Sequence, residues 1–266
     1  MVINGFMALA SDVTAPVVPK ISWNVYSYLV DTLDIGGSAA ASWLLVGFVV
    51  LCAAVAYLLG SINPAIIFSN LMFKDDIRNH GSGNAGSTNV LRTFGKKMAA
   101  LIFILDLLKA VLACFIGKAL LATMGGAIGG LFVIVGHTAP IFYKFKGGKG
   151  AACLAGVALA ISPWSFIILF PTFIIIALVS RYVSLGSIMV SMLFPIVHRA
   201  FHVNDAHPDE GWTLLASIFI MGIVVFMHRA NIKRLMNGTE SKLSFGKKKK
   251  EAQSAEIEDK NDSNGQ

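Results

Sequence analysis

The chain has 266 residues, of which 55% are hydrophobic and only 14% are charged. Soluble domains carry roughly a quarter charged residues, so this composition excludes soluble, disordered and fibrous proteins and predicts a protein that lies in a lipid bilayer. In such a protein the net charge of +7 reflects topology and lipid contact rather than nucleic-acid binding.

The first 41 residues differ in character from the rest. They are of mixed polarity, contain Pro16 and Pro19, and have no basic residue before Lys20. A signal peptide would begin with basic residues and a cleaner apolar stretch. We therefore expect an N-terminal extension over residues 1–41, with an interfacial helix near 21–33.

A transmembrane helix needs about 20 mostly apolar residues, and about seven such stretches follow the extension. They cover 42–60, 98–121, 125–143, 151–162, 163–179, 185–203 and 212–227. Only Ser162-Pro163 separates the fourth from the fifth, which predicts either a tight reversal or one long broken helix. Pro64 should break the first helix, and 65–73 should continue it along the interface. The prediction is an all-α integral membrane protein with a membrane domain at 42–242 and a disordered polar tail at 243–266.

The basic residues indicate the orientation. With seven spans, one side receives the tail and the residues Lys74, Arg78, Arg92, Lys96, Lys97, Lys144, Lys146, Lys149 and Arg181. The other side receives fewer basic residues and the acidic ones Asp205, Asp209 and Glu210. The positive-inside rule then places the N-terminus outside and the C-terminus in the cytoplasm.

The first cytoplasmic loop, residues 78–92, has the composition of a phosphate site. Three glycines lie within six residues, between arginines at both ends, and the polar residues among them are Ser82, Asn84, Ser87, Thr88 and Asn89. Glycines let backbone N–H groups converge on an anion, and Arg92 offers a bidentate fork. The alternative is a flexible polar loop.

The second loop combines glycine with lysine directly before a helix. It reads Gly136-His137-Thr138-Ala139-Pro140 and then Phe145-Lys146-Gly147-Gly148-Lys149-Gly150. A helix N-terminus favours an anion. The spacing is not that of a Walker A loop, so ATP is not implied. The alternative is a basic anchor whose glycines serve the turn.

Other polar residues fall at or near the same side. Ser184 and Ser187 are one helical turn apart, although Ser184 could instead cap a helix. His228 and Asn231 share a helix face just past the last span. Asp106 and Lys109 lie inside the second span, where charges either pair or line a polar site.

Several alternatives find less support. Cys52, Cys114 and Cys153 offer no disulfide framework, and His202, Asp205 and His207 lie in the opposite loop, so we expect no metal site. A small-anion membrane transporter would also place glycines and basic residues at helix ends. It would predict inverted repeats, and neither loop has a second copy.

These motifs resemble the bacterial acyl-phosphate:glycerol-3-phosphate acyltransferases of the PlsY family, from Gly60-Ser61 to Lys242. The matching residues are Gly81-Ser82-Gly83-Asn84, Thr88-Asn89, Arg92, Asp106, Lys109, Gly136-His137, Pro140, Phe145 to Gly150, Val183 to Ser187, His228, Asn231, Arg234, Gly238, Glu240 and Lys242. The departures are Asn63 before Pro64, Ala85 in place of Pro, Ser87 in place of Ala, and Ala152-Cys153 in place of Ala-Thr.

The resemblance implies a seven-span enzyme of the bacterial inner membrane whose active site faces the cytoplasm. Such an enzyme moves a fatty acyl group from acyl phosphate to the 1-hydroxyl of glycerol 3-phosphate, forming lysophosphatidic acid for phospholipid biosynthesis. It contacts membrane lipid and not nucleic acid, and it needs no cofactor, metal or obligate protein partner.

The resemblance also implies residue roles. Lys149, His228 and Asn231 would be catalytic, and Ser82, Arg92, Ser184 and Ser187 would bind glycerol phosphate. Gly147, Gly148 and Gly150 would bind the acyl phosphate, and the supporting residues would be Asn84, Thr88, Asn89, His137, Lys146 and Glu240. The hydroxyl proton would go either to His228 as general base or to the departing phosphate.

Overall fold

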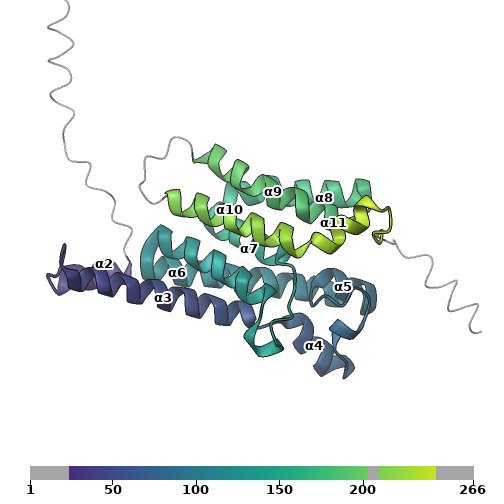
Figure 1. Cartoon of the computed structure of the whole chain (residues 1–266), viewed down its shortest axis with the longest axis horizontal. Coiled ribbons are helices and arrows are strands. Elements are labelled where there is room, and N and C mark those ends of the chain that lie inside the picture. Colours follow the sequence, from purple (N-terminus) through teal and green to yellow (C-terminus); the bar gives the residue numbers. More distant parts are fainter. Residues whose placement is uncertain (1–23, 203–209, 244–266) are drawn as a thin grey trace, which may run out of the picture.

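The computed structural model describes residues 24–202 and 210–243, and within these ranges the regular structure is helical with no β-strand (Figure 1). The helices are α2 (Val25–Thr32), α3 (Ala39–Ser61), α4 (Pro64–Phe73), α5 (Ser87–Thr93), α6 (Lys96–Thr138), α7 (Ala151–Ile161), α8 (Pro163–Ser180), α9 (Val183–Phe201), α10 (Glu210–Met227) and α11 (Arg229–Met236), with 3₁₀ turns at Ile77–Asn79 and Ile141–Tyr143. The all-α prediction is confirmed for this part of the chain.

The helices have membrane-like length and composition. Four helical stretches are long and apolar enough to cross a bilayer, and a fifth is added if α10 and α11, bent by 57°, form one span. The predicted break at Pro64 is confirmed, because α3 ends at Ser61 and Pro64 begins α4. α2 lies within the predicted interfacial segment, whereas most of the extension, the acidic loop and the tail lie outside the described residues.

α6 contains two of the predicted spans joined by a hairpin. Leu121 and Ala122 have non-helical backbone angles. A Cβ added at Gly117 would overlap the carbonyl of Gly125, and one at Gly129 would overlap that of Ala113. Because these pairs are symmetric about residue 121, the two halves of α6 run antiparallel. The second half ends at Thr138, short of the predicted 143, because residues 141–143 form a 3₁₀ turn after Pro140.

The helix ends meet at one pole of the molecule. Arg92, His137, Gly150, Ser184 and His228 line one cleft, although they come from five different helices or the loops beside them. Ala151 at the start of α7 and Leu178 near the end of α8 line one groove beside this cleft. α7 and α8 therefore reverse at Ser162, and the alternative of one long broken helix is wrong.

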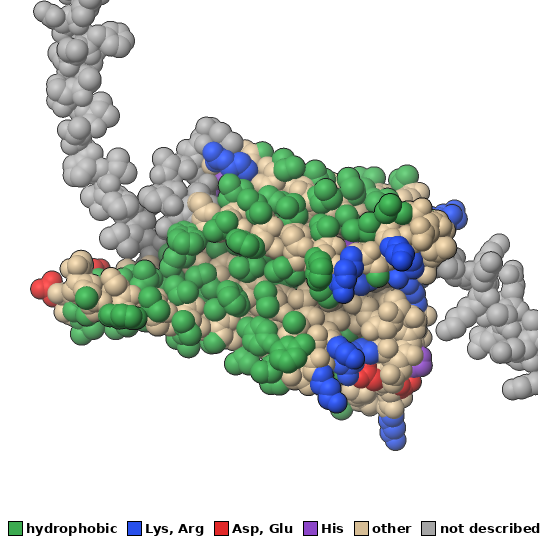
Figure 2. Space-filling view, viewed as in Figure 1, with side chains coloured by type: hydrophobic (Ala, Val, Ile, Leu, Met, Phe, Trp, Pro, Cys, Tyr) green, Lys and Arg blue, Asp and Glu red, His purple; other side chains and the backbone are tan. Residues whose placement is uncertain are grey.

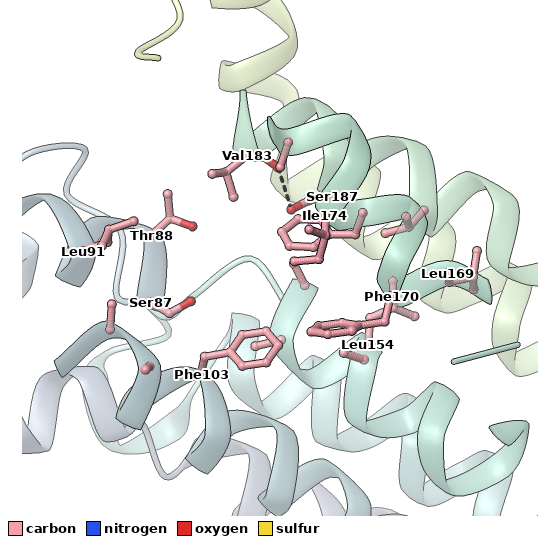
Figure 3. Close-up of a pocket in the computed structure, with 18 of the residues that line it drawn as sticks. Ser87, Thr88, Leu91, Phe103, Leu154, Leu169, Phe170, Ile174, Val183 and Ser187 are labelled. Carbon is pink, nitrogen blue, oxygen red and sulfur yellow. Dashed lines mark hydrogen bonds between the residues drawn. The ribbon is translucent and has the colours of Figure 1, made fainter. Parts of the chain in front are cut away.

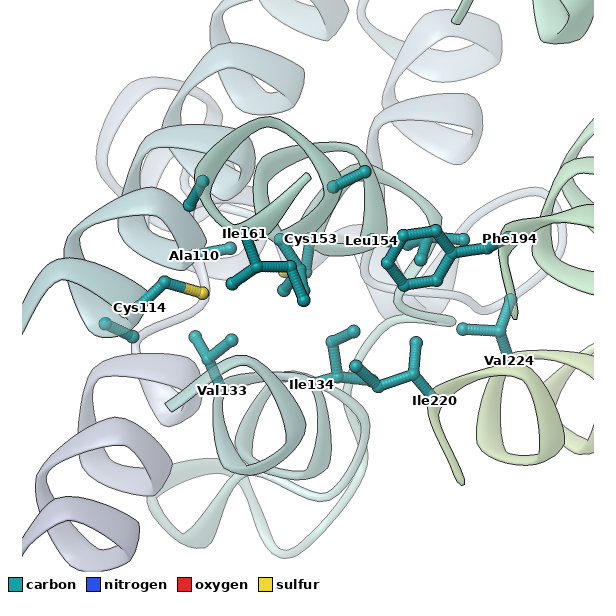
Figure 4. Close-up of a cluster of buried hydrophobic side chains, with 14 of the residues drawn as sticks. Ala110, Cys114, Val133, Ile134, Cys153, Leu154, Ile161, Phe194, Ile220 and Val224 are labelled. Carbon is teal, nitrogen blue, oxygen red and sulfur yellow. The ribbon is translucent and has the colours of Figure 1, made fainter. Parts of the chain in front are cut away.

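A tightly packed core holds this arrangement. Small side chains let the helices approach, and a Cβ at Gly60 or Gly136 would overlap the carbonyl of Val133 or Tyr57 respectively. Figure 4 shows the central cluster, whose buried residues include Ala110, Cys114, Val133, Ile134, Cys153, Val157, Phe194, Ile220 and Val224. In the view of Figure 2, hydrophobic side chains cover much of the length of the helices, while most Lys and Arg side chains gather toward the pole of the cleft.

Candidate active site

The cleft at the pole brings together most of the residues that the sequence singled out. Its lining includes Ser82, Asn84, Thr88, Asn89, Arg92, His137, Lys149, Gly150, Ser184, Ser187, His228, Asn231 and Glu240. Three predicted residues, Lys146, Gly147 and Gly148, lie beside it rather than in its lining. Residues from loops more than a hundred positions apart thus share one small polar space.

A chain of hydrogen bonds runs through the cleft from Lys149 to Glu240. The Lys149 ammonium donates to Asn231 Oδ1 at 2.5 Å, and Asn231 Nδ2 donates to Glu240 Oε1 at 2.7 Å. Ser184 donates to the same carboxylate oxygen at 2.9 Å, and Arg234 Nε donates to Oε2 at 2.7 Å. Glu240 therefore fixes the Asn231 amide so that its oxygen faces Lys149.

Burial and charge set the ionisation of these groups. Burial disfavours the charged form of Glu240, but hydrogen bonds from Arg234, Asn231 and Ser184 outweigh it, and the Glu240 pKa lies below its usual range. Burial, and next the nearby positive charge of Arg234, lower the pKa of Lys149 to about 8. The site therefore holds a carboxylate, Glu240, and an ammonium group, Lys149, which loses its positive charge at mildly alkaline pH.

His228 presents one ring nitrogen to the cleft. It is buried at the break between α10 and α11, and its Nδ1 lies 2.8 Å from the carbonyl of Val224. A carbonyl can only accept, so Nδ1 carries the proton and Nε2 carries the lone pair. The tertiary structure thus supplies an orienting group for this histidine, and that group is a backbone carbonyl.

Asn89 organises the first glycine loop. Its Nδ2 donates to the carbonyls of Ile77 at 3.0 Å and His80 at 2.9 Å, and its Oδ1 accepts from the Ser82 N–H at 3.0 Å. Gly81 has a φ of +56°, and a Cβ there would overlap Asn89 Oδ1. The loop therefore forms a hydrogen-bonded shell around a buried amide.

The two arginines that flank this loop have different partners. Arg78 pairs with Asp76 at 2.7 Å and donates to the carbonyls of Tyr143 and Lys146, so it ties the first loop to the second. Arg92 makes one long bond of 3.4 Å to the carbonyl of Ser241 and lines the cleft. Arg92 rather than Arg78 is thus placed to bind an anion.

Packing requires glycine in the second loop independently of any ligand. A Cβ at Gly147 would overlap the carbonyl of His137, and one at Gly148 would overlap His137 Nε2. The Gly148 N–H donates to the His137 carbonyl at 3.0 Å. Gly150, with φ of +87°, is the N-cap of α7 and makes no side-chain cap bond. Gly150, Ala151 and Ala152 line the cleft, so the start of α7, with its uncapped amides, borders the polar space.

Asp106, Lys109 and His137 form a buried charged cluster behind the cleft. Lys109 lies 2.7 Å from Asp106 Oδ1 and 3.0 Å from His137 Nδ1. It also donates to the carbonyls of Gly60 and Ile62. The Gly60 carbonyl would normally accept from residue 64, which is proline and has no N–H. Lys109 thus supplies the hydrogen bonds that the carbonyl groups at the end of α3 lack. Asp106 pairs with Lys109 and also lines the cleft.

Among the described residues, two members of this cluster and the neighbouring Cys153 form a group that could hold a metal ion. The ligand atoms of Asp106, His137 and Cys153 lie within 4.8 Å of one another. The Lys109 ammonium already lies against the carboxylate, and its charge opposes a divalent cation. The donor set therefore fits an internal ion pair better than a metal.

Ser184 does not cap a helix, contrary to the simpler alternative. Residue 182 is the N-cap of α9 and makes no side-chain cap bond. Ser184 donates to Glu240, and Ser187 donates to the carbonyl of Val183 at 3.1 Å. Both serines are buried and line the cleft, as expected for residues one turn apart.

Sequence reasoning gave no role to Asn63, which is fully buried. Its Oδ1 accepts from Ile66 N–H at the start of α4, and its Nδ2 donates to the Ala85 carbonyl at 3.2 Å. It thus joins the break in α3 to the first loop. The sequence did offer a signal for this capping role: Asn63 directly precedes Pro64, and Asn is a strong N-cap residue.

An apolar groove opens from the polar cleft (Figure 3). Its volume is about 360 Å³, and α6, α7, α8 and α9 supply most of its walls. The two spaces share the residues Ser87, Thr88, Ala151, Ala152, Val183 and Ser187. A molecule with a polar head and a long apolar tail would fit both spaces at once.

Known proteins have sequences similar to this one. The sequence model of the family described as "Glycerol-3-phosphate acyltransferase" matches residues 50–238. The glycerol-3-phosphate acyltransferase of Thermoanaerobacter sp. (strain X514) is 44% identical over 196 residues, which cover 74% of this chain and 96% of the relative. That of Bordetella pertussis is 42% identical over 197 residues, covering 73% and 90%.

Solved structures share the fold. The glycerol 3-phosphate form of PlsY (YgiH), an integral membrane glycerol 3-phosphate acyltransferase, matches with a TM-score of 0.67 and 36% identity, covering 74% of this chain and 96% of that one. Its lysophosphatidic acid form matches with a TM-score of 0.64 and 34% identity, covering 74% and 95%.

Proposed function

This chain belongs to the glycerol-3-phosphate acyltransferase family, and from that premise we propose that it transfers a fatty acyl group from acyl phosphate to the 1-hydroxyl of glycerol 3-phosphate. The product is lysophosphatidic acid. The names of the relatives favour this enzyme over the small-anion transporter.

One observation carries the proposal: a small cationic cleft opens directly into an apolar groove. Lys149, Arg92 and the first turn of α7 supply positive charge and amide donors for phosphate. The groove offers an apolar wall for a fatty chain. A glycerol phosphate and an acyl phosphate would meet at the residues shared by the two spaces.

Because acyl phosphate is already an activated acyl donor, the reaction needs no covalent intermediate on the protein. The 1-hydroxyl oxygen attacks the carbonyl carbon of the acyl phosphate, the ester C–O bond forms, and the bond to phosphate breaks. In our proposal the departing phosphate takes the hydroxyl proton, so the protein need not supply a general base. Lys149 and the amides of the first turn of α7 stabilise the oxyanion and the phosphate.

The test is a comparison of acyl donors. Purified enzyme with glycerol 3-phosphate should form lysophosphatidic acid from palmitoyl phosphate and not from palmitoyl-CoA or palmitoyl-acyl carrier protein. Transfer from the thioesters alone would show that the donor assignment is wrong. No transfer from any donor would contradict the proposed activity.

Arg92→Lys should weaken binding of the acceptor. Lysine keeps the charge but loses the planar fork that grips a phosphate with two parallel bonds, so the KM for glycerol 3-phosphate should rise at least about tenfold. Arg199→Lys is the matched control, since Arg199 is exposed and lies outside the cleft. Steady-state kinetics with unchanged KM would remove Arg92 from the acceptor site.

Activity should fall at alkaline pH because of Lys149. Its pKa is lowered to about 8, so its positive charge is present below that pH and is lost as the pH rises through it. We expect kcat/KM to fall above pH 8 by up to about tenfold per pH unit. Lys149→Arg keeps its charge and should not show this fall. The measurement is a pH profile of both proteins against an enzyme-free blank.

We also propose seven crossings, by α3, the two halves of α6, and α7 to α10, with the cleft facing the cytoplasm of a bacterial inner membrane. The one-sided basic residues support this orientation. Lys97→Cys should react with an impermeant thiol reagent only from the cytoplasmic side, and Arg199→Cys only from the other. Both residues are exposed, and the native cysteines are buried. The reverse labelling pattern would overturn the orientation.

A further inference from the structure

We propose that Phe103, Phe166 and Phe170 close the far end of the apolar groove and thereby set the length of the acyl chain that the enzyme prefers. The inference rests on the proposed function, because it assigns the groove to the acyl chain. It concerns the groove's end wall, which contacts the end of the chain and not the reacting atoms.

The groove runs along the helices away from the cleft. On α6 its lining begins at Lys96 and reaches no further than Phe103, a distance of about 10 Å for seven helical residues. On α7 it begins at Ala151 and reaches Ala158, and on α8 it reaches back to Phe166. Of the three lining residues furthest from the cleft on these helices, two are phenylalanines, Phe103 and Phe166.

The rings of Phe103, Phe166 and Phe170 contact each other in this part of the groove. The centroids of Phe103 and Phe170 are 6.1 Å apart, and those of Phe166 and Phe170 are 5.2 Å apart in a stacked arrangement. Phe103 comes from α6, whereas the other two come from α8, and Figure 3 shows Phe103 facing Phe170. Aromatic pairs at such distances attract each other beyond simple burial, so the wall is held from both sides.

Beside this wall α6 and α7 leave no space for a chain to pass between them. Leu107 lies one turn beyond Phe103, and a Cβ at Gly156 of α7 would overlap the Leu107 carbonyl. The two backbones therefore touch beside the groove, between its lining residues Ala155 and Ala158. A chain that fills the groove must stop at the rings unless it leaves sideways into the lipid between α6 and α8.

Chain length should therefore affect kcat/KM in a way that depends on the rings. Each methylene that enters an apolar site gains roughly fourfold in binding. For the native enzyme kcat/KM should rise along the series from lauroyl phosphate and then level or fall once the chain reaches the rings. Phe103→Ala and Phe170→Ala remove the wall, so the rise should continue to longer chains.

The experiment measures kcat/KM for lauroyl, myristoyl, palmitoyl, stearoyl and arachidoyl phosphates. In both Ala variants the preference for stearoyl over myristoyl phosphate should increase by about tenfold or more, with the KM for glycerol 3-phosphate unchanged. Phe103→Trp, which retains bulk, should move the preference toward shorter chains. Phe219→Ala on α10 is the control, since Phe219 is exposed outside the groove.

An unchanged chain-length profile in the folded Ala variants would overturn the inference and indicate that the chain leaves sideways. If the Ala variants do not fold, an unchanged profile in Phe103→Trp would overturn it equally. A native enzyme that uses no acyl phosphate at all would instead contradict the proposed function. The two failures are thus distinguishable.

Discussion

Gly148→Ala is expected to reduce kcat/KM for acyl phosphate by about a hundredfold. The added methyl would overlap His137 Nε2 and lie 2.7 Å from its Cε1 atom. The ring cannot swing away easily, because His137 is 3% exposed and its Nδ1 contacts Lys109. The loop must therefore move, and a displacement of about 1 Å of a positioning group costs on the order of a hundredfold in rate.

The same substitution should also lower stability. Overpacking a buried site costs about 1–3 kcal/mol, so we expect a lower melting temperature in detergent together with the kinetic loss. This differs from the expectation for a free-standing loop, where folding would be intact. Gly47→Ala is the control, because a Cβ at Gly47 on α3 meets nothing within 4 Å.

A double variant separates the two explanations for Gly148. If the methyl acts by pushing on the ring, His137→Ala with Gly148→Ala should recover part of the activity relative to Gly148→Ala. If the methyl instead displaces the phosphate directly, the second substitution should bring no recovery. Native kinetics in Gly148→Ala itself would show that this loop does not position the donor.

Glu240→Gln is expected to reduce turnover by about a hundredfold or more, although no role in contacting substrate is needed. The carboxylate accepts from Asn231 and Ser184 on one oxygen and from Arg234 on the other. A glutamine has one acceptor and one donor end, so its NH₂ would face either Arg234 or Asn231. The Asn231 amide would lose its fixed orientation, and Lys149 would lose the partner at 2.5 Å.

The stability cost of Glu240→Gln should be about 1–3 kcal/mol, the usual penalty for a buried donor left without an acceptor. Asp31→Asn on α2 is the control, since Asp31 is exposed. If Glu240 acts through Asn231, then Glu240→Gln and Asn231→Ala should be less than additive in kcat/KM. Full additivity, or a loss of stability without a loss of turnover, would show that Glu240 is only structural.

Hydropathy and residue type were enough to predict much of the helical structure of this protein. Apolar length predicted the helices, because a membrane span is a local property of about 20 residues. Proline chemistry predicted the break at Pro64, because it depends on one missing N–H. Ser82, Arg92 and Lys149, which line the cleft, were singled out because glycine-rich basic loops have the composition of a phosphate site, whereas the role predicted for His228 came from the family resemblance.

Only the tertiary structure decided how these residues act on each other. Lys109 satisfies the carbonyls of Gly60 and Ile62, Asn89 holds the first loop, and Glu240 sets the Asn231 amide. Position 148 requires glycine because a Cβ there would overlap His137, and this contact is not visible in the sequence. Such partners lie up to dozens of positions apart, and helix packing rather than local pattern determines which side chains meet. The same reason applies to the groove, because its end wall is formed by rings from two helices that only the folded bundle brings together.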